Sequence, residues 1–331
     1  MRFALTEEQQ GFAEVLDDLL SHADTPAVVR RWADGDHAAG LALWRRLADL
    51  GVTGLLVPEE HGGLDADPVD MMVAFEALGR HAVPGPWIES VALLPRLLAH
   101  VDGQAEALGS IASGKRLSTA SVTALGRHGL DADVAHEPFV LDETVLYSAK
   151  VGPLQRSIDP ARRLFVLDAD SAVADVADAD VSAALDHAVL ACSAQLLGAG
   201  EHLLRDSVAY AKTRTQFGRA IGEYQALKHA LADVRVALDF ARPLVHVAAL
   251  SLRDLSPHAS RDVSAAKVTA GDAAYAAART ALQVHGAIGY TAEHDLGLWI
   301  TKVRALLNAW GTPAVHRARV LAVISHETGV A

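Results

Sequence analysis

One apolar pattern constrains the fold of this chain more than any other feature of its sequence. Between Leu227 and Ala248, apolar residues recur every three or four positions over several helical turns. This spacing places them on one face of a long α-helix. Two similar runs cover residues 265–282 and 296–307. Because such helices bury their apolar faces against one another, we predict an antiparallel helix bundle. Pro243 is expected to distort the first of these helices locally without ending it.

The N-terminal third is also predicted to be helical. Thr6 is followed three residues later by Gln9, which is the spacing of a capping box, and we expect a helix from there to about Leu20. Apolar residues recur at helical spacing again in residues 44–50 and 71–78. Residues 1–113 therefore form a helical domain, with Pro84-Gly85-Pro86 as an internal break.

The pattern changes between the two helical parts. Short β-prone pieces at residues 139–141, 145–147 and 164–167 are separated by Asp, Gly and Pro. We predict a small β domain over residues 114–185, followed by the bundle over residues 186–331. The acidic alternation at residues 174–180 suggests an exposed edge or loop. The expected fold class is mainly α with a small middle β domain.

Charge and cysteine content exclude several classes of partner. Lys and Arg number 29 against 41 Asp and Glu, and 29 − 41 gives a net charge of −12. A field of that sign repels nucleic acid and anionic lipid, so we expect neither as a partner. Cys192 is the one cysteine in the sequence, which rules out an internal disulfide and favours the cytoplasm.

Export, membrane insertion and metal binding are not expected either. The first residues lack the basic-then-apolar order of a signal peptide. The uncharged stretch at residues 188–200 is shorter than the roughly 18 apolar residues of a membrane span. None of the 16 histidines forms a His-x3-His pair with a nearby carboxylate, so no metal site is predicted.

Two stretches depart from plain core patterning. The loop Arg214-Thr215-Gln216-Phe217-Gly218-Arg219, with Gln225 beyond it, offers a guanidinium, an amide and an aromatic edge to a phosphate or nucleotide. Its other interpretation is a solvated helix connection. Residues 283–291 form a glycine-spaced turn in which backbone amides and Gln283 could approach an anion. Its other interpretation is an ordinary helix C-cap.

Together with further segments, these stretches resemble the acyl-CoA dehydrogenase family. The likeness covers nearly the whole chain, and its motifs stand in family order and at family spacing. They are residues 50–55, residues 57–63, Glu76-Ala77-Leu78-Gly79-Arg80, residues 214–218 with Gln225, and residues 283–291 with Glu293-His294. The resemblance implies the same order of domains: N-terminal helices, a middle β domain and a C-terminal four-helix bundle.

The resemblance also implies FAD as cofactor and an acyl-CoA thioester as substrate. In this family the β domain of one subunit holds the flavin ring, and the neighbour's bundle holds the pyrophosphate and adenine. By position, the cofactor-binding residues of this chain are Arg214 at the pyrophosphate, Gln216 and Phe217 at the adenosine, Gln283 with the Gly286-Ala287 backbone at the phosphates, and Thr312. Ala287 stands where many members have Gly.

The ring side of the site departs from the family pattern. Members carry a Thr-Glu…Gly-Ser-Asp loop and a Trp beside the flavin ring, and neither occurs between Lys115 and Asp186. The family removes the α-proton with a glutamate in a Tyr-Glu-Gly-Thr turn. The matching turn here has Trp310 in place of that glutamate, and the family's alternative position on the first bundle helix is Ala188.

No other residue is predicted as the catalytic base. Asp186 is two residues from Ala188, about 200° away around a helix. His285 and Glu293 lie near the Gln283 turn, and both have a structural interpretation: a satisfied helix-end histidine and a hydrogen-bonding member of the family's Glu-His pair. All three remain candidates.

These features leave three hypotheses. Some bacterial members are built from two different chains, often act on bulky CoA thioesters including steroid side chains, and form α2β2 tetramers. The first hypothesis makes this chain the subunit that completes the FAD site of such a partner, which supplies the glutamate for α,β-desaturation. The second is a self-sufficient homo-oligomeric flavoenzyme with a relocated base or other chemistry. The third is a flavin-free scaffold or binding protein.

Overall fold

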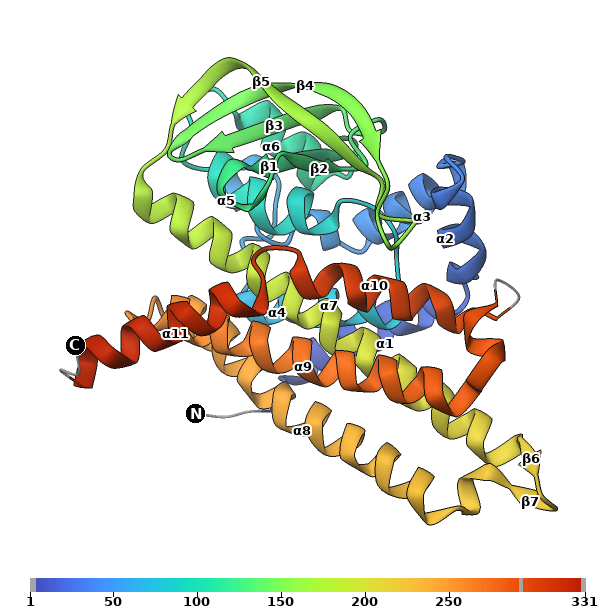
Figure 1. Cartoon of the computed structure of the whole chain (residues 1–331). Helices are drawn as coiled ribbons and strands as arrows, with labels where there is room; N and C mark the ends of the chain where they lie inside the picture. The colour runs from blue at the N-terminus through green and yellow to red at the C-terminus, as the bar shows by residue number, and fades with distance from the viewer. Residues whose placement is uncertain (1–3, 292–293, 329–331) are drawn as a thin grey trace.

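The computed structural model describes residues 4–291 and 294–328. N-terminal helices, a sheet domain and a bundle of long helices follow one another along the chain, and the sheet covers one side of the helical body (Figure 1). The predicted fold class is confirmed. The N-terminal elements are α1 (Glu7–Ser21), α2 (Thr25–Ala33), α3 (Ala38–Asp49), η1 (Val52–Gly54), η2 (Glu59–His61), α4 (Pro68–Arg80), η3 (Ile88–Leu93), α5 (Leu94–Leu98) and α6 (Ala105–Ala112).

The local signals in the N-terminal third act as predicted. The Gln9 amide donates to Thr6 Oγ1 at 3.2 Å, and the Thr6 amide donates to Gln9 Oε1 at 3.1 Å. This reciprocal capping box starts α1, which ends at Ser21. The other two apolar runs fall in α3 and α4. The Pro-Gly-Pro break separates α4 from η3, a π-helix.

The middle domain is a five-stranded sheet in the order β1-β3-β4-β5-β2. Strands β1 and β3 pair in parallel and the other neighbours are antiparallel. The three predicted β pieces lie in β3, β4 and β5. The elements are β1 (Ser118–Val122), η4 (Thr123–Leu125), β2 (His128–Leu130), β3 (Glu137–Asp142), β4 (Val145–Gln155) and β5 (Leu164–Asp175).

The acidic alternation at residues 174–180 is largely exposed, as predicted for an exposed edge or loop, but it runs from the end of β5 into a helix. Asp175 ends β5 and pairs with Val145 of β4. Asp178 and Asp180 lie in the first turn of α7 (Asp178–Thr213). Carboxylates are favourable at a helix N-terminus, where they face its unpaired amides and positive dipole end. The acidic residues therefore mark a helix start.

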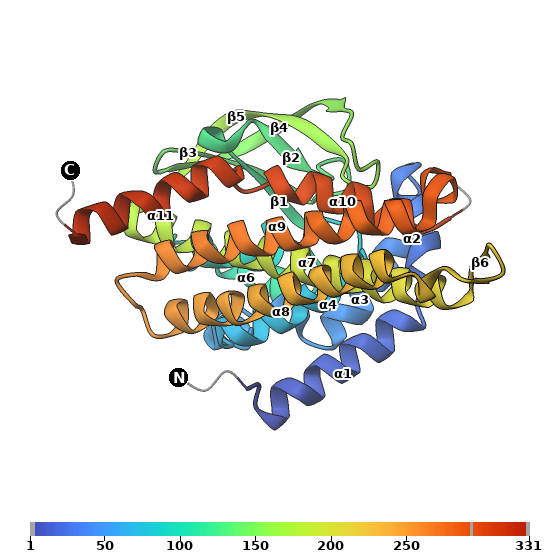
Figure 2. The same ribbon diagram turned by 60° about the horizontal axis from the view of Figure 1, so that its bottom comes forward.

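The C-terminal part is the predicted helix bundle. Its first helix begins at Asp178, so the domain boundary proposed between residues 185 and 186 falls inside α7. Helix α8 continues through Pro243 without a break. The long helices run alongside one another, with α7 against α9 and α4 (Figure 2). The remaining elements are β6 (Thr215–Gln216), β7 (Arg219–Ala220), η5 (Ile221–Glu223), α8 (Gln225–Arg253), α9 (Ala259–His285), η6 (Gly286–Tyr290), α10 (Leu296–Asn308) and α11 (Pro313–Thr328).

Two glycines bring α4 and α7 into backbone contact. A Cβ on Gly79 would lie 2.1 Å from the carbonyl oxygen of Gln195, and one on Gly198 would lie 2.0 Å from the carbonyl oxygen of Glu76. Neither position can hold a side chain without a backbone shift, because real Cβ contacts are longer. The N-terminal helices and the bundle consequently share one apolar core.

Helix α7 is the one described helix long and apolar enough to cross a membrane by length and composition. However, 83% of its most apolar stretch is buried inside the fold. Its apolar character is therefore accounted for by its place in the core.

Candidate functional site

The predicted adenosine-side residues lie on a short hairpin at the far end of α7. Strands β6 and β7 pair through a two-residue turn of Phe217 (φ 52°) and Gly218 (φ 80°). Two successive left-handed residues are typical of the tight turns that match strand twist. The Phe217 side chain is 93% exposed, and Arg214 and Gln216 are exposed as well. The polar stretch is thus a projecting hairpin (Figures 1 and 2).

The second motif closes α9 at the same end of the bundle. Gln283 lies in the last turn of α9, which ends at His285 and is capped by Gly286 with φ 62°. An open groove at this end is lined by Arg279, Thr280, Leu282, Gln283, Gly286 and Ala287. Tyr210, one turn before Arg214, stacks on His285 with ring centroids 4.3 Å apart. This stacking ties the helix end before the hairpin to the helix end before the Gln283 turn.

His285 is held by its neighbours. The residue is 5% exposed, and its Nδ1 donates to the carbonyl oxygen of Ala281 at 2.8 Å. Burial lowers the pKa of His285 below its usual value. The His294 ring packs against it edge-on, with centroids 5.0 Å apart. The other candidate base of this region, Glu293, lies outside the described residues.

These residues fit the adenosine-pyrophosphate half of FAD. Within the described parts of the chain, the Arg214 and Gln283 side chains take part in no hydrogen bond or ion pair, and both are exposed. A free guanidinium and a free amide beside a glycine-terminated helix end suit a pyrophosphate. Exposed Phe217 offers an aromatic face to a nucleoside.

A separate cavity of about 390 Å³ lies between the sheet and the C-terminal end of α10. Trp310, which we predicted to occupy the family's usual glutamate position, is part of its wall. The other lining residues come from η3, from β1 to the start of β2, from the β4–β5 connection with the first residue of β5, and from the end of α10: Glu89, Ala120, Ser121, Val122, Leu125, Gly126, His128, Ser157, Ile158, Arg162, Leu164, Arg304, Ala305, Asn308 and Ala309.

The turn that carries Trp310 is fixed by a buried histidine. His316 Nε2 donates to the Trp310 carbonyl oxygen at 3.0 Å, so Nδ1 accepts from the Ser264 hydroxyl at 3.2 Å. Burial lowers the pKa of His316 to about 4. Trp310 itself has a positive φ of 60°. Thr312 Oγ1 accepts from the Val315 amide at 3.4 Å, which starts α11.

The other proposed base positions do not reach this cavity. Ala188 is fully buried in α7. Asp186 accepts hydrogen bonds from the Ser260 hydroxyl and, at 3.0 Å, from Arg319. It lines a different groove, together with His187. The Asp186 carboxylate is therefore committed to an ion pair away from Trp310.

Sequence reasoning missed one carboxylate of the cavity. Glu89 lies on η3, is 4% exposed and contributes to the cavity wall. Its Oε2 has no hydrogen-bond partner in the described structure. Burial raises the pKa of Glu89 to about 7, against the opposing effect of the Arg162 charge. The available signal was a lone acid in the otherwise apolar run that surrounds residue 89.

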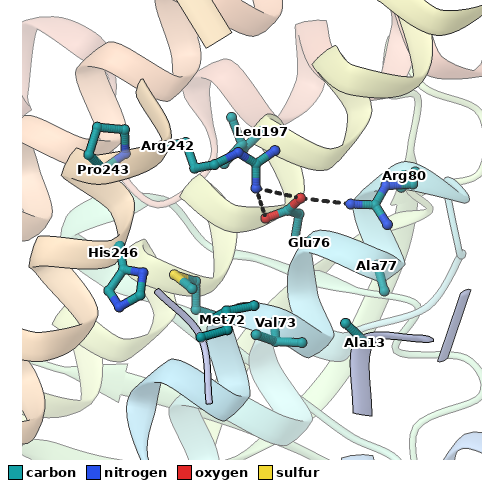
Figure 3. Close-up of a pocket in the computed structure, with 11 residues that line it drawn as sticks. Ala13, Met72, Val73, Glu76, Ala77, Arg80, Leu197, Arg242, Pro243 and His246 are labelled. Carbon is teal, nitrogen blue, oxygen red and sulfur yellow. Dashed lines mark hydrogen bonds and ion pairs between the residues drawn. The ribbon is translucent and has the colours of Figure 1, made fainter. Parts of the chain in front are cut away.

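A more apolar pocket of about 320 Å³ lies between α1, α4, α7 and α8 (Figure 3). Glu76 points into it, but its carboxylate is occupied by Arg80 at 2.7 Å and Arg242 at 2.9 Å. Met72, Val73 and Leu197 form apolar wall. None of the predicted site residues lines this pocket, and its ion pairs join α4 to α8.

A metal centre has no support in the described parts of the chain, where no group of three His, Cys, Asp or Glu side chains is placed to hold an ion.

Comparison with known proteins identifies the family. A model of the acyl-CoA dehydrogenase N-terminal domain matches residues 6–114, and one of the C-terminal domain matches residues 179–325. The chain belongs to the acyl-CoA dehydrogenase family. The resemblance seen in the sequence is thus confirmed, and FAD is the cofactor of the family.

Relatives and solved structures agree with this membership. Acyl-CoA dehydrogenase IpdE2 of Mycobacterium tuberculosis is 32% identical over 89% of this chain and 91% of its own length. The ChsE4-ChsE5 complex from the same organism has a TM-score of 0.80 at 23% identity, covering 100% of both chains. PigA, solved with FAD and proline, has a TM-score of 0.85 at 17% identity, again over 100% of both chains. At these identities the two structures show the acyl-CoA dehydrogenase fold alone.

Proposed function

We propose that this chain is a subunit of a two-chain, FAD-dependent acyl-CoA dehydrogenase and completes the FAD site of a catalytic partner. Its exposed hairpin and Gln283 turn would hold the pyrophosphate and adenosine of an FAD whose ring lies in the partner's β domain. The partner would supply the glutamate that removes the α-proton of an acyl-CoA thioester.

The proposal rests on one observation. Within this chain, the hairpin expected to hold the adenosine side of FAD lies far from the cavity beside Trp310. The thiol of Cys192 on α7 lies 3.9 Å from the carbonyl oxygen of Ala309 in the cavity wall. Helix α7 continues from there to Thr213, immediately before the hairpin. Those 21 residues (213 − 192) span about 30 Å at 1.5 Å per residue. One extended FAD cannot reach that far, so a hairpin that binds FAD would serve another chain.

The residues expected near the flavin ring favour a partner that is a different chain over a partner that is a second copy of this chain. Trp310 replaces the usual glutamate, Ala188 fills the alternative position, and Asp186 is ion-paired elsewhere. A solved neighbour is itself a complex of two named chains, ChsE4 and ChsE5. A subunit freed from catalysis by its partner has no need to keep its own base.

The residues of this chain would bind and orient the FAD. Arg214 would pair with the pyrophosphate, Gln283 and the Gly286-Ala287 amides would donate to it, and Phe217 with Gln216 would cover the adenosine. When bound, FAD supplies a hydride acceptor for the Cβ hydrogen of the acyl group. The lone buried Cys192 agrees with the expected cytoplasmic location.

The test is the visible spectrum and native mass of the chain, alone and with a second acyl-CoA dehydrogenase-like chain. We expect a colourless protein that gains about half an equivalent of flavin per chain on forming an α2β2 complex. Arg214→Ala should lower flavin retention in the complex at least tenfold. Its matched control is Arg219→Ala on the paired strand, whose guanidinium stacks on Tyr224 at 3.9 Å, and it should retain flavin.

Two outcomes would overturn the proposal in different directions. One flavin per chain in a homodimer or homotetramer of this chain alone would establish a self-sufficient flavoenzyme. No flavin even with a partner chain would establish a flavin-free scaffold on this fold.

A further inference from the structure

The cavity beside Trp310 has a cationic wall, although the chain as a whole carries a net charge of −12. Glu89 is the one acidic residue among those that line it, whereas Arg162 and Arg304 both do so. Burial raises the pKa of Glu89 to about 7, so this carboxyl group is partly uncharged at neutral pH. Arg304 lies over the Tyr275 ring, 5.0 Å from its centroid, which leaves the guanidinium N–H groups free. An excess of positive charge around one cavity of an acidic protein favours a negatively charged ligand.

The Arg162 side chain has no counterion. Within the described parts of the chain it takes part in no hydrogen bond or ion pair, and it is only partly exposed. Its charge acts on buried Glu89, which places the guanidinium towards the interior. The next residue, Arg163, instead forms an ion pair with Asp133 and donates to His37 Nε2. Of these two neighbouring arginines, the one that lines the cavity is the one left without a partner.

Two buried lysines add positive charge behind the cavity wall. Lys302 and Lys267 donate their Nζ protons to backbone carbonyl oxygens, at 2.9 Å and 2.8 Å, and neither forms an ion pair with a described carboxylate. Burial lowers the pKa of both, to about 8 for Lys302, which therefore stays mainly protonated at pH 7. The charge of Arg162 acts on both as a nearby like charge. The acid that acts on Lys302, Asp159, is 3% exposed, and burial raises its pKa.

Trp310 offers a second donor without an acceptor. The other four tryptophans each donate the indole N–H to an oxygen atom, at 2.9–3.0 Å. The Trp310 N–H donates to no described residue, although Trp310 lines the cavity. Its φ of 60° is also strained for a bulky residue. Strain of this kind is concentrated at functional sites, where the surrounding structure holds it in place.

We propose that this cavity binds a small organic carboxylate, which pairs with Arg162 and packs its apolar body against Ile158, Leu164 and Trp310. The planar guanidinium matches the two oxygens of a carboxylate. The indole N–H supplies a further donor to the same group. The volume of about 390 Å³ and the apolar part of the wall suit a ligand with a hydrocarbon body. Inorganic phosphate would use the charge but not the apolar wall.

This inference goes beyond the proposed function and does not rest on its flavin half-site. The cavity is separate from the hairpin that would complete a partner. Loss of flavin retention on changing Arg214 and loss of carboxylate binding on changing Arg162 are independent results. The visible spectrum of the same sample shows whether the chain carries flavin, so the failure of one proposal is distinguishable from the failure of the other.

The experiment is a calorimetric titration of the full-length chain, purified alone, with cyclohexanecarboxylate at pH 7. We expect saturable binding of one molecule per chain. Cyclohexanecarboxamide has nearly the same shape without the charge and should bind at least about tenfold more weakly, the loss expected for a charge-assisted hydrogen bond. Inorganic phosphate should also bind at least tenfold more weakly. Equal binding of the amide, or phosphate binding as tight as that of the carboxylate, would overturn the proposal.

Arg162→Gln should lower the affinity for cyclohexanecarboxylate at least about tenfold. The matched control is Arg156→Gln, which removes the same charge from an exposed position in the same β4–β5 connection, outside the cavity lining. It should bind within about twofold of the wild type. Trp310→Phe keeps an aromatic ring, removes the N–H donor and should lower the affinity about threefold. No saturable binding by the wild type, or equal affinities of the two arginine variants, would contradict the assignment.

Discussion

The ring of Tyr210 lies against the imidazole of His285, with an interplanar angle of 27° and centroids 4.3 Å apart. Tyr210 precedes the hairpin and His285 precedes the Gly286 turn, so this contact sets the spacing between the two sequences expected to hold one FAD. The pair acts as a positioning element, because neither ring is expected to touch the cofactor.

Replacing Tyr210 by Ala should therefore weaken flavin retention in the assembled complex about tenfold, while Tyr210→Phe retains it because the stacking survives. Aromatic pairs contribute about 0.5–1.5 kcal/mol beyond their buried area, so Tyr210→Ala should also lower the Tm by a few degrees. Flavin titration and thermal unfolding measure the two effects. Equal flavin retention by both variants would show that the contact does not position the half-site.

Glu76 joins α4 to α8 through Arg242 and to its own helix through Arg80 (Figure 3). Glu76→Gln should lower the free energy of unfolding by roughly 2 kcal/mol, because two guanidinium groups lose the charge that they share in a partly buried site. Asp272→Asn breaks the ion pair with Arg317, in which both side chains are more than half exposed, and should cost less than 1 kcal/mol. Urea unfolding distinguishes the two, and equal losses would contradict the role of Glu76.

Glu89 should make the fold less stable as the pH rises. Its pKa is about 7 in the folded protein against 4.5 for the model group, so the folded state binds the extra proton between these values. The free energy of unfolding then falls from about pH 4.5 to about pH 7 and stays low above. Glu89→Gln should change the free energy of unfolding more favourably at pH 8 than at pH 5, by up to about 3 kcal/mol. Ser121→Ala, which removes no ionisable group, should show no such pH-dependent gain.

His316 should have the opposite pH dependence. Its folded pKa of about 4 lies below the model value of 6.5, so the folded state binds fewer protons between pH 4 and pH 6.5. Its contribution is complete above pH 6.5 and is lost as the pH falls towards 4. Tm measurements should show a smaller acid-induced decrease for His316→Gln than for the wild type. The control is His22→Gln, at a site where the side chain is 75% exposed. Its Tm should decrease in acid as much as that of the wild type.

The helices were predictable because their signals are local. The Thr6–Gln9 box and the apolar runs in α3, α4, α8, α9 and α10 depend on spacing along the chain. The helix start within the acidic alternation was not predicted, because Asp residues suit exposed edges, loops and helix N-termini alike.

The candidate site was predictable only in part. Arg214, Gln283 and Trp310 stand in motifs that keep their order in the sequence. Glu89 stands in none, because its burial arises from the packing of η3 on the sheet and on α7. Its missing partner and the shared cavity with Ser121 result from contacts between three separate parts of the chain.

The glycine contacts between α4 and α7 also bear on how the molecule can move. Gly79 and Gly198 leave no layer of side chains between the two helices. The helices are therefore not expected to slide past each other at this contact. The N-terminal helices and the bundle should behave mechanically as one stiff block. A bulkier residue at Gly79 or Gly198 would push α4 and α7 apart and so displace the N-terminal helices relative to the bundle.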